Sequence, residues 1–302
     1  MLAEPFGKGI EEPMIWDFPY DSPNAIIALL ESHGFAMSKK FGQNFLISPS
    51  ARQKITDCLQ PLSGRRVWEI GPGIGALTTL LLQNEAQVTA FEIDHGFCRI
   101  LREEAFPDEN ALVLIEGDAL KTWHAIYEQE GVPDLIFGNL PYNIGSICIA
   151  RFLESQCLPQ RMVFTLQKEV GERLGAGPGS KAWSTLSILA QIDYEVEQVS
   201  LIKGSAFFPP PNVDSVVIRM EKRPQPMVNV AIRDLFLQLM DDLFTQRRKT
   251  VRNNLLHGKA GSRHGKEVVL QALADAGIPE SERAEKLGFD ELLRLAEAFA
   301  TL

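Results

Sequence analysis

Short apolar runs alternate with longer segments of helical periodicity through the first two thirds of the chain. The runs are rich in Val, Ile, Leu and Phe, as buried parallel strands are, and they lie at 67–70, 87–92, 112–115, 135–137 and 162–166. A further run at 215–220 closes the series. This alternation predicts an α/β fold with a doubly wound sheet that finishes in an antiparallel strand.

The pattern changes after residue 222. Pro224 and Pro226 break the chain, and apolar residues then recur at helical spacing at positions 232, 235, 236, 239 and 243. Near the end of the sequence, Asp290 is predicted to be the N-cap of a last helix that buries Leu292, Leu295, Ala296 and Phe299. These features predict a small all-helical domain.

Three parts follow from these breaks. Residues 1–37 form an acidic N-terminal extension, in which 24–33 are expected to form a short helix. Residues 38–222 form the α/β domain and residues 223–302 the helical domain. A chain of 302 residues, 45% of them apolar, is long enough for two domains with a substantial core.

A glycine-rich turn follows the first predicted strand. Gly71, Gly73 and Gly75 can approach a ligand closely and adopt a positive φ, as in loops that hold nucleotides. Their Gly-x-Gly-x-Gly spacing differs from the Gly-x-Gly-x-x-Gly of dinucleotide sites, which disfavours NAD. Glu69, just before the turn, suits a cation such as a sulfonium or an amino group better than a pyrophosphate.

Polar side chains also follow the next predicted strands. Glu92 ends the second strand, where doubly wound folds place the carboxylate that holds ribose hydroxyls. Asp118 follows the third strand and can accept a hydrogen bond from an adenine amino group. Either acid alone could be a solvated loop carboxylate. Together with the glycine-rich turn and Asn139 they indicate a ligand site, because ligands bind at the carboxyl ends of parallel strands.

The segment Gly138-Asn139-Leu140-Pro141-Tyr142 places an amide and an aromatic ring on a proline turn. The exocyclic amine of a nucleobase is a poor nucleophile, so an enzyme that alkylates it must accept its N–H hydrogen bonds and stack against the base. Asn139 can accept, and Tyr142 can stack. An ordinary turn at the end of a strand is the alternative interpretation.

These segments, in this order, resemble the rRNA adenine N6,N6-dimethyltransferases. The resemblance runs from about Ser38 to near the C-terminus. The further segments that carry it are Lys39-Lys40-Phe41-Gly42-Gln43-Asn44-Phe45-Leu46, Gln167-Lys168-Glu169-Val170, Phe207-Phe208-Pro209-Pro210-Pro211-Asn212-Val213-Asp214-Ser215 and Gln246-Arg247-Arg248-Lys249-Thr250-Val251-Arg252-Asn253-Asn254-Leu255.

The resemblance implies a Rossmann-like methyltransferase sheet that binds S-adenosyl-L-methionine. The residues that it assigns to the cofactor are Asn44, Leu46, Gly71, Gly73, Glu92, Asp118 and Asn139. It also implies that Asn139 and the Leu140 carbonyl accept hydrogen bonds from the target amine beside Pro141, with Tyr142 and Phe207 sandwiching the flipped base. The chain departs from the family at Gly145-Ser146 and Trp183-Ser184, both of which we interpret as packing variants.

The charge distribution adds a candidate RNA surface. The net charge of −9 opposes RNA binding if it is read over the whole chain, because phosphate contacts come from Lys and Arg. Residues 246–266, however, hold seven Lys or Arg and no acid. Within this stretch we expect Arg247, Arg248, Lys249 and Arg252 to contact RNA. The alternative is that some of these arginines pair with carboxylates to dock the helical domain on the α/β domain.

Composition excludes other classes of protein. No apolar run approaches the length of a membrane span, and the first residues are acidic and unlike a signal peptide. The four cysteines and five histidines show no metal-binding spacing, so we expect no metal. Reduced cysteines are expected in a cytoplasmic protein, and we expect a monomer.

The sequence therefore predicts dimethylation of two adjacent adenines near the 3′ end of small-subunit (16S) rRNA, in a pre-30S particle. Two alternatives remain open. One is large-subunit adenine methylation of the antibiotic-resistance type, which shares the catalytic motifs. The other is a non-catalytic RNA-binding assembly or transcription factor on the same fold, in which the site residues would be expected to decay.

Overall fold

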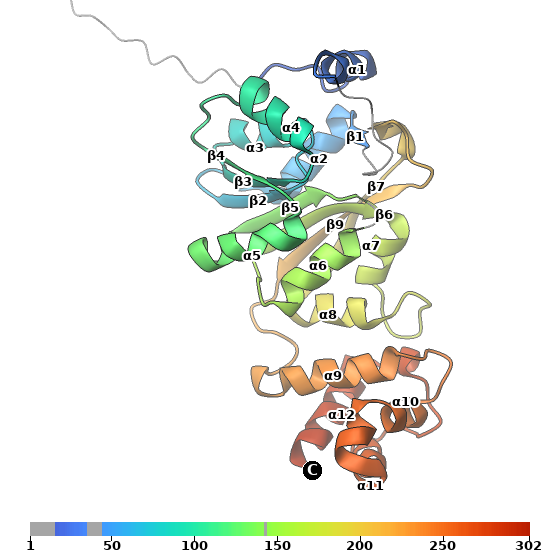
Figure 1. Ribbon diagram of the computed structural model, residues 1–302. Helices are drawn as coiled ribbons and strands as arrows, with labels where there is room; N and C mark the ends of the chain where they lie inside the picture. Colours follow the sequence, from blue (N-terminus) through green and yellow to red (C-terminus); the bar gives the residue numbers. More distant parts are fainter. Residues whose placement is uncertain (1–15, 35–43, 142–143) are drawn as a thin grey trace, which may run out of the picture.

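A seven-stranded sheet forms the centre of the computed structural model, which describes residues 16–34, 44–141 and 144–302 (Figure 1). Its strand order is β4 (Leu112–Glu116), β3 (Gln87–Glu92), β2 (Arg66–Ile70), β5 (Leu135–Asn139), β6 (Arg161–Gln167), β9 (Ser215–Lys222) and β7 (Tyr194–Ile202). The first five strands are parallel, and β9 pairs antiparallel with both β6 and β7. The predicted doubly wound sheet with an antiparallel finish is confirmed.

The strand β7 is not among the runs that the sequence pattern predicts. It lies at the edge of the sheet, and only its first and last residues, Tyr194 and Ile202, are buried. Its sequence therefore mixes Glu, Gln and Ser with apolar residues, and lacks the continuous apolar run of the central strands.

Helices cover both faces of the sheet. Successive residues of a strand point to opposite faces, so Val67 packs in one apolar layer and Trp68 in the other. The first layer includes α2 (Pro49–Leu59) and α3 (Thr78–Gln83). The second includes α5 (Ala119–Glu130), α6 (Gly145–Glu154), α7 (Lys168–Leu174) and α8 (Thr185–Asp193), as Figure 1 shows.

The C-terminal part is the predicted helical bundle. Its principal helices are α9 (Arg233–Phe244), α10 (Val251–His257), α11 (Lys259–Asp275) and α12 (Phe289–Thr301). The prediction of Asp290 as N-cap is wrong, because α12 begins at Phe289 after Gly288. The Glu291 carboxylate accepts a hydrogen bond from the Gly288 N–H at 2.7 Å. Asp290 lies in the first turn, where its negative charge interacts favourably with the helix dipole.

The two domains share one apolar core. Trp183, Ile188 and Ile192, from the α/β domain, are fully buried in the same cluster as the apolar faces of α9, α11 and α12. The Trp183 indole N–H donates to the Leu287 carbonyl at 3.1 Å, across the boundary. This departure from the family pattern is thus an interdomain packing residue. The domain boundary after residue 222 remains a prediction.

The N-terminal extension contains the expected short helix. Helix α1 (Pro23–Ser32) begins after Ser22, whose side chain accepts from the Ala25 N–H at 3.3 Å, and Pro23 occupies the first turn. It lies near β1 (Phe45–Leu46), which pairs antiparallel with β8 (Phe207–Phe208) (Figure 1). No helix of the described residues is long and apolar enough to span a membrane.

Candidate active site

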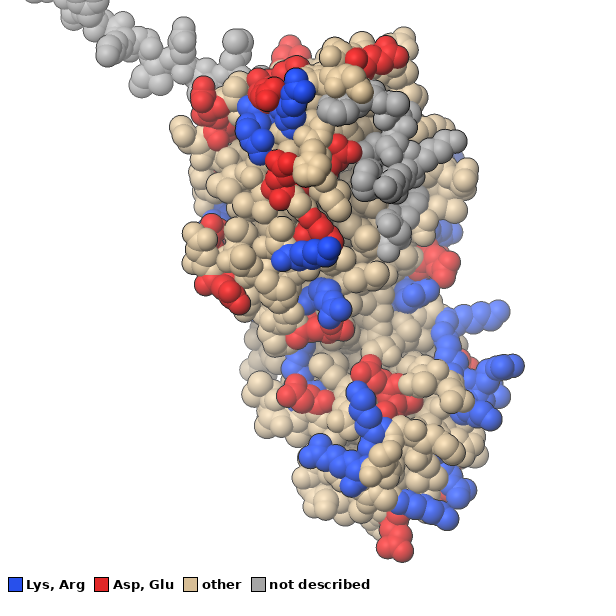
Figure 2. Space-filling view, viewed as in Figure 1, with Lys and Arg blue, Asp and Glu red and all other residues tan. Residues whose placement is uncertain are grey.

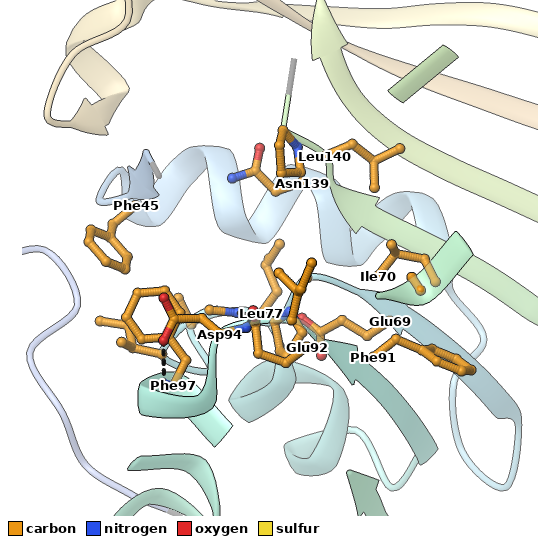
Figure 3. A pocket seen from close by; sticks show the side chains of 18 of the residues that line it. Phe45, Glu69, Ile70, Leu77, Phe91, Glu92, Asp94, Phe97, Asn139 and Leu140 are labelled. Atoms are coloured by element: carbon orange, nitrogen blue, oxygen red, sulfur yellow. Dashed lines mark hydrogen bonds between the residues drawn. The ribbon is translucent and has the colours of Figure 1, made fainter. Parts of the chain in front are cut away.

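A cavity of about 260 Å³ opens at the carboxyl ends of β2, β3 and β5. Figure 3 shows Asn139 and Leu140 on one side of it and Glu92 and Asp94 on the other. The cavity brings together every predicted cofactor and catalytic residue that the structure describes: Asn44, Leu46, Gly71, Gly73, Glu92, Asp118, Asn139, Leu140, Pro141 and Phe207. Tyr142 and most of the segment 39–46 lie outside the described residues.

The glycine-rich turn requires its glycines for two different reasons. Gly71 and Gly73 have φ values of 73° and 60°, in the left-handed region that favours glycine. A Cβ at Gly71 would meet no described atom within 4 Å, so conformation and not packing requires glycine there. At Gly75 a Cβ would lie 2.8 Å from the Phe106 ring, so close packing also excludes a side chain.

Glu92 is buried beneath this turn. One carboxylate oxygen accepts from the Gly73 N–H at 3.0 Å, and the other accepts from the Asp94 N–H at 2.9 Å. Burial raises the pKa of Glu92 to about 7, although these hydrogen bonds oppose the rise. Glu92 therefore shapes the glycine-rich turn and also presents a carboxylate to the cavity.

Glu69 is a second buried acid beside the cavity. Its carboxylate accepts a hydrogen bond from the Thr78 hydroxyl at 2.6 Å. Burial, together with the nearby charge of Glu92, raises the pKa of Glu69 to about 8. A bound cation would stabilise the ionised form of both acids, as the sequence suggested for Glu69.

Asp118 caps α5 as well as lining the cavity. Its Oδ1 accepts from the Leu120 N–H at 3.0 Å, and its other oxygen lies 3.8 Å from the Lys121 ammonium. The cap fixes the side chain at the end of β4, while a third of it remains exposed. An additional donor can therefore reach the carboxylate.

Asn139 ends β5 with its amide held in one orientation. Its Nδ2 donates to the Asn44 carbonyl at 3.3 Å, which leaves Oδ1 as the acceptor. The Leu140 N–H donates to the Thr165 carbonyl of β6 at 3.2 Å, which fixes the next residue. A Cβ at Gly138 would lie 2.6 Å from the Ile70 carbonyl, so only glycine allows β5 to run this close to β2.

Phe207 forms part of the wall beside Leu46. The two residues are direct partners in the β1–β8 ladder, and Phe207 is 3% exposed. The pairing explains how motifs that are far apart in the sequence contribute to one cavity.

The sequence analysis did not predict several residues of the wall. Tyr20, Ile26 and Phe97 line the cavity, and Asp94 caps α4 (His95–Ile100) at its edge. Asp94 could have been found from its position two residues after Glu92. Tyr20 and Ile26 belong to no recognisable motif. They line the cavity because the N-terminal segment packs against the α/β domain.

The predicted RNA contacts lie on the helical domain, over which Figure 2 shows many Lys and Arg side chains. Arg247, Arg248 and Lys249 occupy the exposed turn between α9 and α10. Arg247 donates to the Lys181 carbonyl at 2.7 Å and to the Glu285 carboxylate at 3.1 Å. Arg252 pairs with Glu280 at 3.3 Å. Two of the four residues thus have protein partners. Both carboxylates belong to the helical part itself, and only the Arg247 bond to the Lys181 carbonyl reaches the α/β part, so the carboxylate pairing between domains that the alternative proposed is not seen for these two arginines.

The described residues hold no cluster of metal ligands. No group of three His, Cys, Asp or Glu side chains among them could hold a metal ion. The four cysteines are buried and free.

Comparisons with known proteins agree with this geometry. The ribosomal RNA adenine dimethylase family model matches residues 34–301. The small-subunit rRNA methyltransferase A of Treponema denticola is 40% identical over 94% of this chain and 96% of its own. A Plasmodium falciparum dimethyladenosine transferase structure has a TM-score of 0.72 at 26% identity, over 84% of this chain and 96% of that one. The 23S rRNA methyltransferase ErmE reaches 0.64 at 25%, over 85% and 100% respectively.

These matches cover both domains and every motif described above. The chain belongs to the ribosomal RNA adenine dimethylase family.

Proposed function

We propose that this protein transfers methyl groups from S-adenosyl-L-methionine to N6 of two adjacent adenines near the 3′ end of small-subunit rRNA, giving N6,N6-dimethyladenines. The observation that carries the proposal is that Asn139 and Leu140 lie across one cavity from Glu92 (Figure 3). The residues that we assign to the target amine and the residue that we assign to the nucleoside of the cofactor therefore line the same cavity.

The hydrogen-bond acceptors of the cavity fit this cofactor. Glu92 accepts from the ribose hydroxyls, and Asp118 accepts from the adenine amino group. Glu69, which is buried beside the glycine-rich turn, matches the positive charge of the cofactor. When bound, S-adenosyl-L-methionine supplies a methyl group on a sulfonium, which is a strong methyl donor.

Asn139 orients the target amine. Its Nδ2 is held by the Asn44 carbonyl, so Oδ1 is available to accept an N–H hydrogen bond from adenine. The Leu140 carbonyl accepts the second N–H of the unmodified amine. These two acceptors draw electron density towards nitrogen and hold its lone pair in line for attack, a preorganised arrangement that lowers the barrier.

No side chain is required as a general base before attack. The amine proton is acidic only after the methyl group has been transferred, and it can then leave to solvent. The monomethylated amine keeps one N–H for Asn139, so the same residues serve the second transfer. Phe207 and Tyr142 stack on the flipped base, which offsets the few kcal/mol lost by unstacking it from the RNA.

The helical domain contacts the rRNA. Arg248 and Lys249 are the strongest candidates for phosphate contacts, because both are exposed and neither side chain has an ion pair within the described residues. The proposal extends to a monomer that acts in the cytoplasm on a pre-30S particle.

Large-subunit methylation is the second candidate, supported by the likeness to ErmE. The higher identity to small-subunit enzymes, 40% against 25%, favours the first. A non-catalytic role is disfavoured, because the described residues of the site retain the acceptors that the chemistry needs.

Labelled S-adenosyl-L-methionine, incubated with either undermodified 30S particles or naked large-subunit rRNA, tests the proposal. We expect two dimethylated adenines in the small-subunit RNA when the modified nucleosides are mapped. Labelling confined to large-subunit RNA would establish the second candidate, and no transfer to either RNA would leave the non-catalytic role.

A further inference from the structure

The segment that carries α1 forms one wall of the cavity that contains Glu92 and Asp118. Tyr20 and Ile26 line this cavity, although both precede the region 34–301 that the family model matches. They are 7% and 0% exposed, so the segment is packed against the α/β domain. The motifs shared with the family do not explain this wall.

Tyr20 is bonded to the glycine-rich turn and the helix after it. Its hydroxyl donates to the Ile74 carbonyl at 3.3 Å and shares a hydrogen bond with the Thr79 hydroxyl at 2.9 Å. Ile74 lies between Gly73 and Gly75, which both have positive φ. The Tyr20 hydroxyl therefore braces the part of the turn that approaches the ligand.

Arg52 connects Tyr20 to β1. Its guanidinium lies 5.6 Å from the centre of the Tyr20 ring. The same group donates to the Leu46 carbonyl at 3.0 Å and to the Ile47 carbonyl at 3.2 Å. Tyr20 is thus linked through one side chain to β1, which carries Leu46 into the cavity.

Ile26 provides the apolar part of the wall. It belongs to one buried cluster with Phe45, Ile74 and Phe97, all of which also line the cavity. The next residue, Ile27, is 36% exposed and does not line the cavity. The helix therefore presents two isoleucines of the same size in different surroundings.

We propose that residues 16–34 are a cofactor-binding element, in which Ile26 excludes water from the glycine-rich side of the cavity and Tyr20 holds the turn in its binding conformation. This inference rests on the assignment of the cavity to S-adenosyl-L-methionine under the proposed function. Both residues are positioning residues that raise affinity for the cofactor, and neither touches the reacting amine.

Calorimetric titration of the full chain with S-adenosyl-L-methionine tests the wall. We expect Ile26→Ala to weaken binding about tenfold, the effect of losing roughly 1.4 kcal/mol of apolar packing and turn support. Tyr20→Phe, which removes only the hydroxyl, should weaken binding about fivefold. The matched control Ile27→Ala, on the same helix, should bind within about twofold of the unmodified protein.

Steady-state kinetics separates cofactor binding from general damage. The KM for S-adenosyl-L-methionine should rise in Ile26→Ala and Tyr20→Phe by a larger factor than kcat falls. The KM for the 30S particle should not change. If Ile26→Ala does not fold, Ile26→Val and Tyr20→Phe keep the test open, because each removes only one small group.

Glu92→Ala distinguishes this inference from the assignment on which it rests. If Glu92→Ala abolishes cofactor binding while Ile26→Ala and Tyr20→Phe bind normally, the segment is only a structural support and the inference is wrong. If Glu92→Ala also binds normally, the cavity is not the cofactor site and the proposed function fails with it.

Discussion

Arg247 donates a hydrogen bond to the Lys181 carbonyl at 2.7 Å, so the first arginine of the basic turn joins the helical domain to the α/β domain. The same guanidinium binds Glu285 at 3.1 Å. Its neighbours Arg248 and Lys249 have no such partner among the described residues, which divides the predicted RNA contacts into two groups with different expected roles.

Separate substitutions should reveal this division. Arg247→Ala should lower stability by about 1 kcal/mol, because a half-exposed ionic hydrogen bond is removed, and should lower the melting temperature by about 2 °C. The salt dependence of particle binding should change little. Thermal unfolding and binding at several salt concentrations measure both quantities.

Replacing Arg248 and Lys249 together with Ala should have the opposite result. The log–log salt slope of particle binding should fall by about 0.7 to 0.9 for each phosphate that the protein no longer neutralises, with an unchanged melting temperature. A double variant with the original slope would remove both residues from the RNA surface. Cofactor affinity serves as the control, since neither residue lines the cavity.

Asn139→Ala should abolish most methyl transfer while the protein still folds. Loss of one preorganised hydrogen bond at a reacting centre costs roughly 2.7 to 4 kcal/mol, or about 10²- to 10³-fold in rate. Single-turnover transfer to undermodified 30S particles measures the loss. Turnover close to that of the unmodified protein would contradict the role of Asn139 in holding the amine.

Cofactor affinity should increase with pH through the titration of Glu92. Burial raises the pKa of Glu92 to about 7, and the ionised carboxylate is the stronger acceptor for ribose hydroxyls. We expect affinity to fall several-fold between pH 8 and pH 6, and Glu92→Gln to lose the inflection near 7. Titrations across this range check the effect.

The same pKa shift has the opposite consequence for folding. Between the ordinary carboxyl pKa and about 7, the folded state holds a proton that the unfolded state releases. The contribution of Glu92 to the free energy of unfolding is therefore present at low pH and is lost as pH rises through this window. Burial raises the pKa of Glu69 to about 8, so Glu69 contributes a dependence of the same sign, and Glu92→Gln should remove only the part that belongs to Glu92. Urea titrations at several pH values measure the change. A pH dependence that is unchanged in Glu92→Gln would show that Glu92 does not contribute to it.

A buried ion pair at the domain interface should be costly to break. Arg233, at the start of α9, binds Asp193, at the end of α8, through hydrogen bonds of 2.9 and 2.6 Å, and both side chains are under a tenth exposed. Asp193→Ala should cost about 3 to 5 kcal/mol, because an unpaired charge stays buried. Denaturant unfolding measures this cost.

The exposed pair of Arg99 and Glu103 is the matched control for the interface. Glu103→Ala should cost less than about 1 kcal/mol, because solvent screens that pair. If Asp193→Ala costs no more than Glu103→Ala, Arg233 does not remain as an unpaired buried charge and the prediction is wrong.

The sequence determined the sheet and the ligand acceptors at its carboxyl edge. Buried parallel strands need continuous apolar runs, so β2, β3, β5 and β6 could be located from local pattern alone. The edge strand β4 was located as well, because residues 112–115 form a continuous apolar run although none of the strand's residues is fully buried. Parallel order also implies that Glu92, Asp118 and Asn139 meet at one edge, since all three follow strand ends. The edge strand β7 was not predicted, because Glu, Gln and Ser interrupt its apolar residues. The start of α12 was placed two residues too late, because Asp290 is a common N-cap residue type but lies in the first turn after Gly288.

Only the tertiary structure decided how distant segments complete the site. The Tyr20 hydroxyl bonds to residues 54 and 59 positions away, and Arg247 binds a carbonyl 66 positions away. Local periodicity reports which face of an element is apolar, and it carries no information about which other element covers that face. The α1 wall of the cavity and the interdomain contact of Arg247 depend on which distant segments pack together, and this is determined only when the whole chain folds.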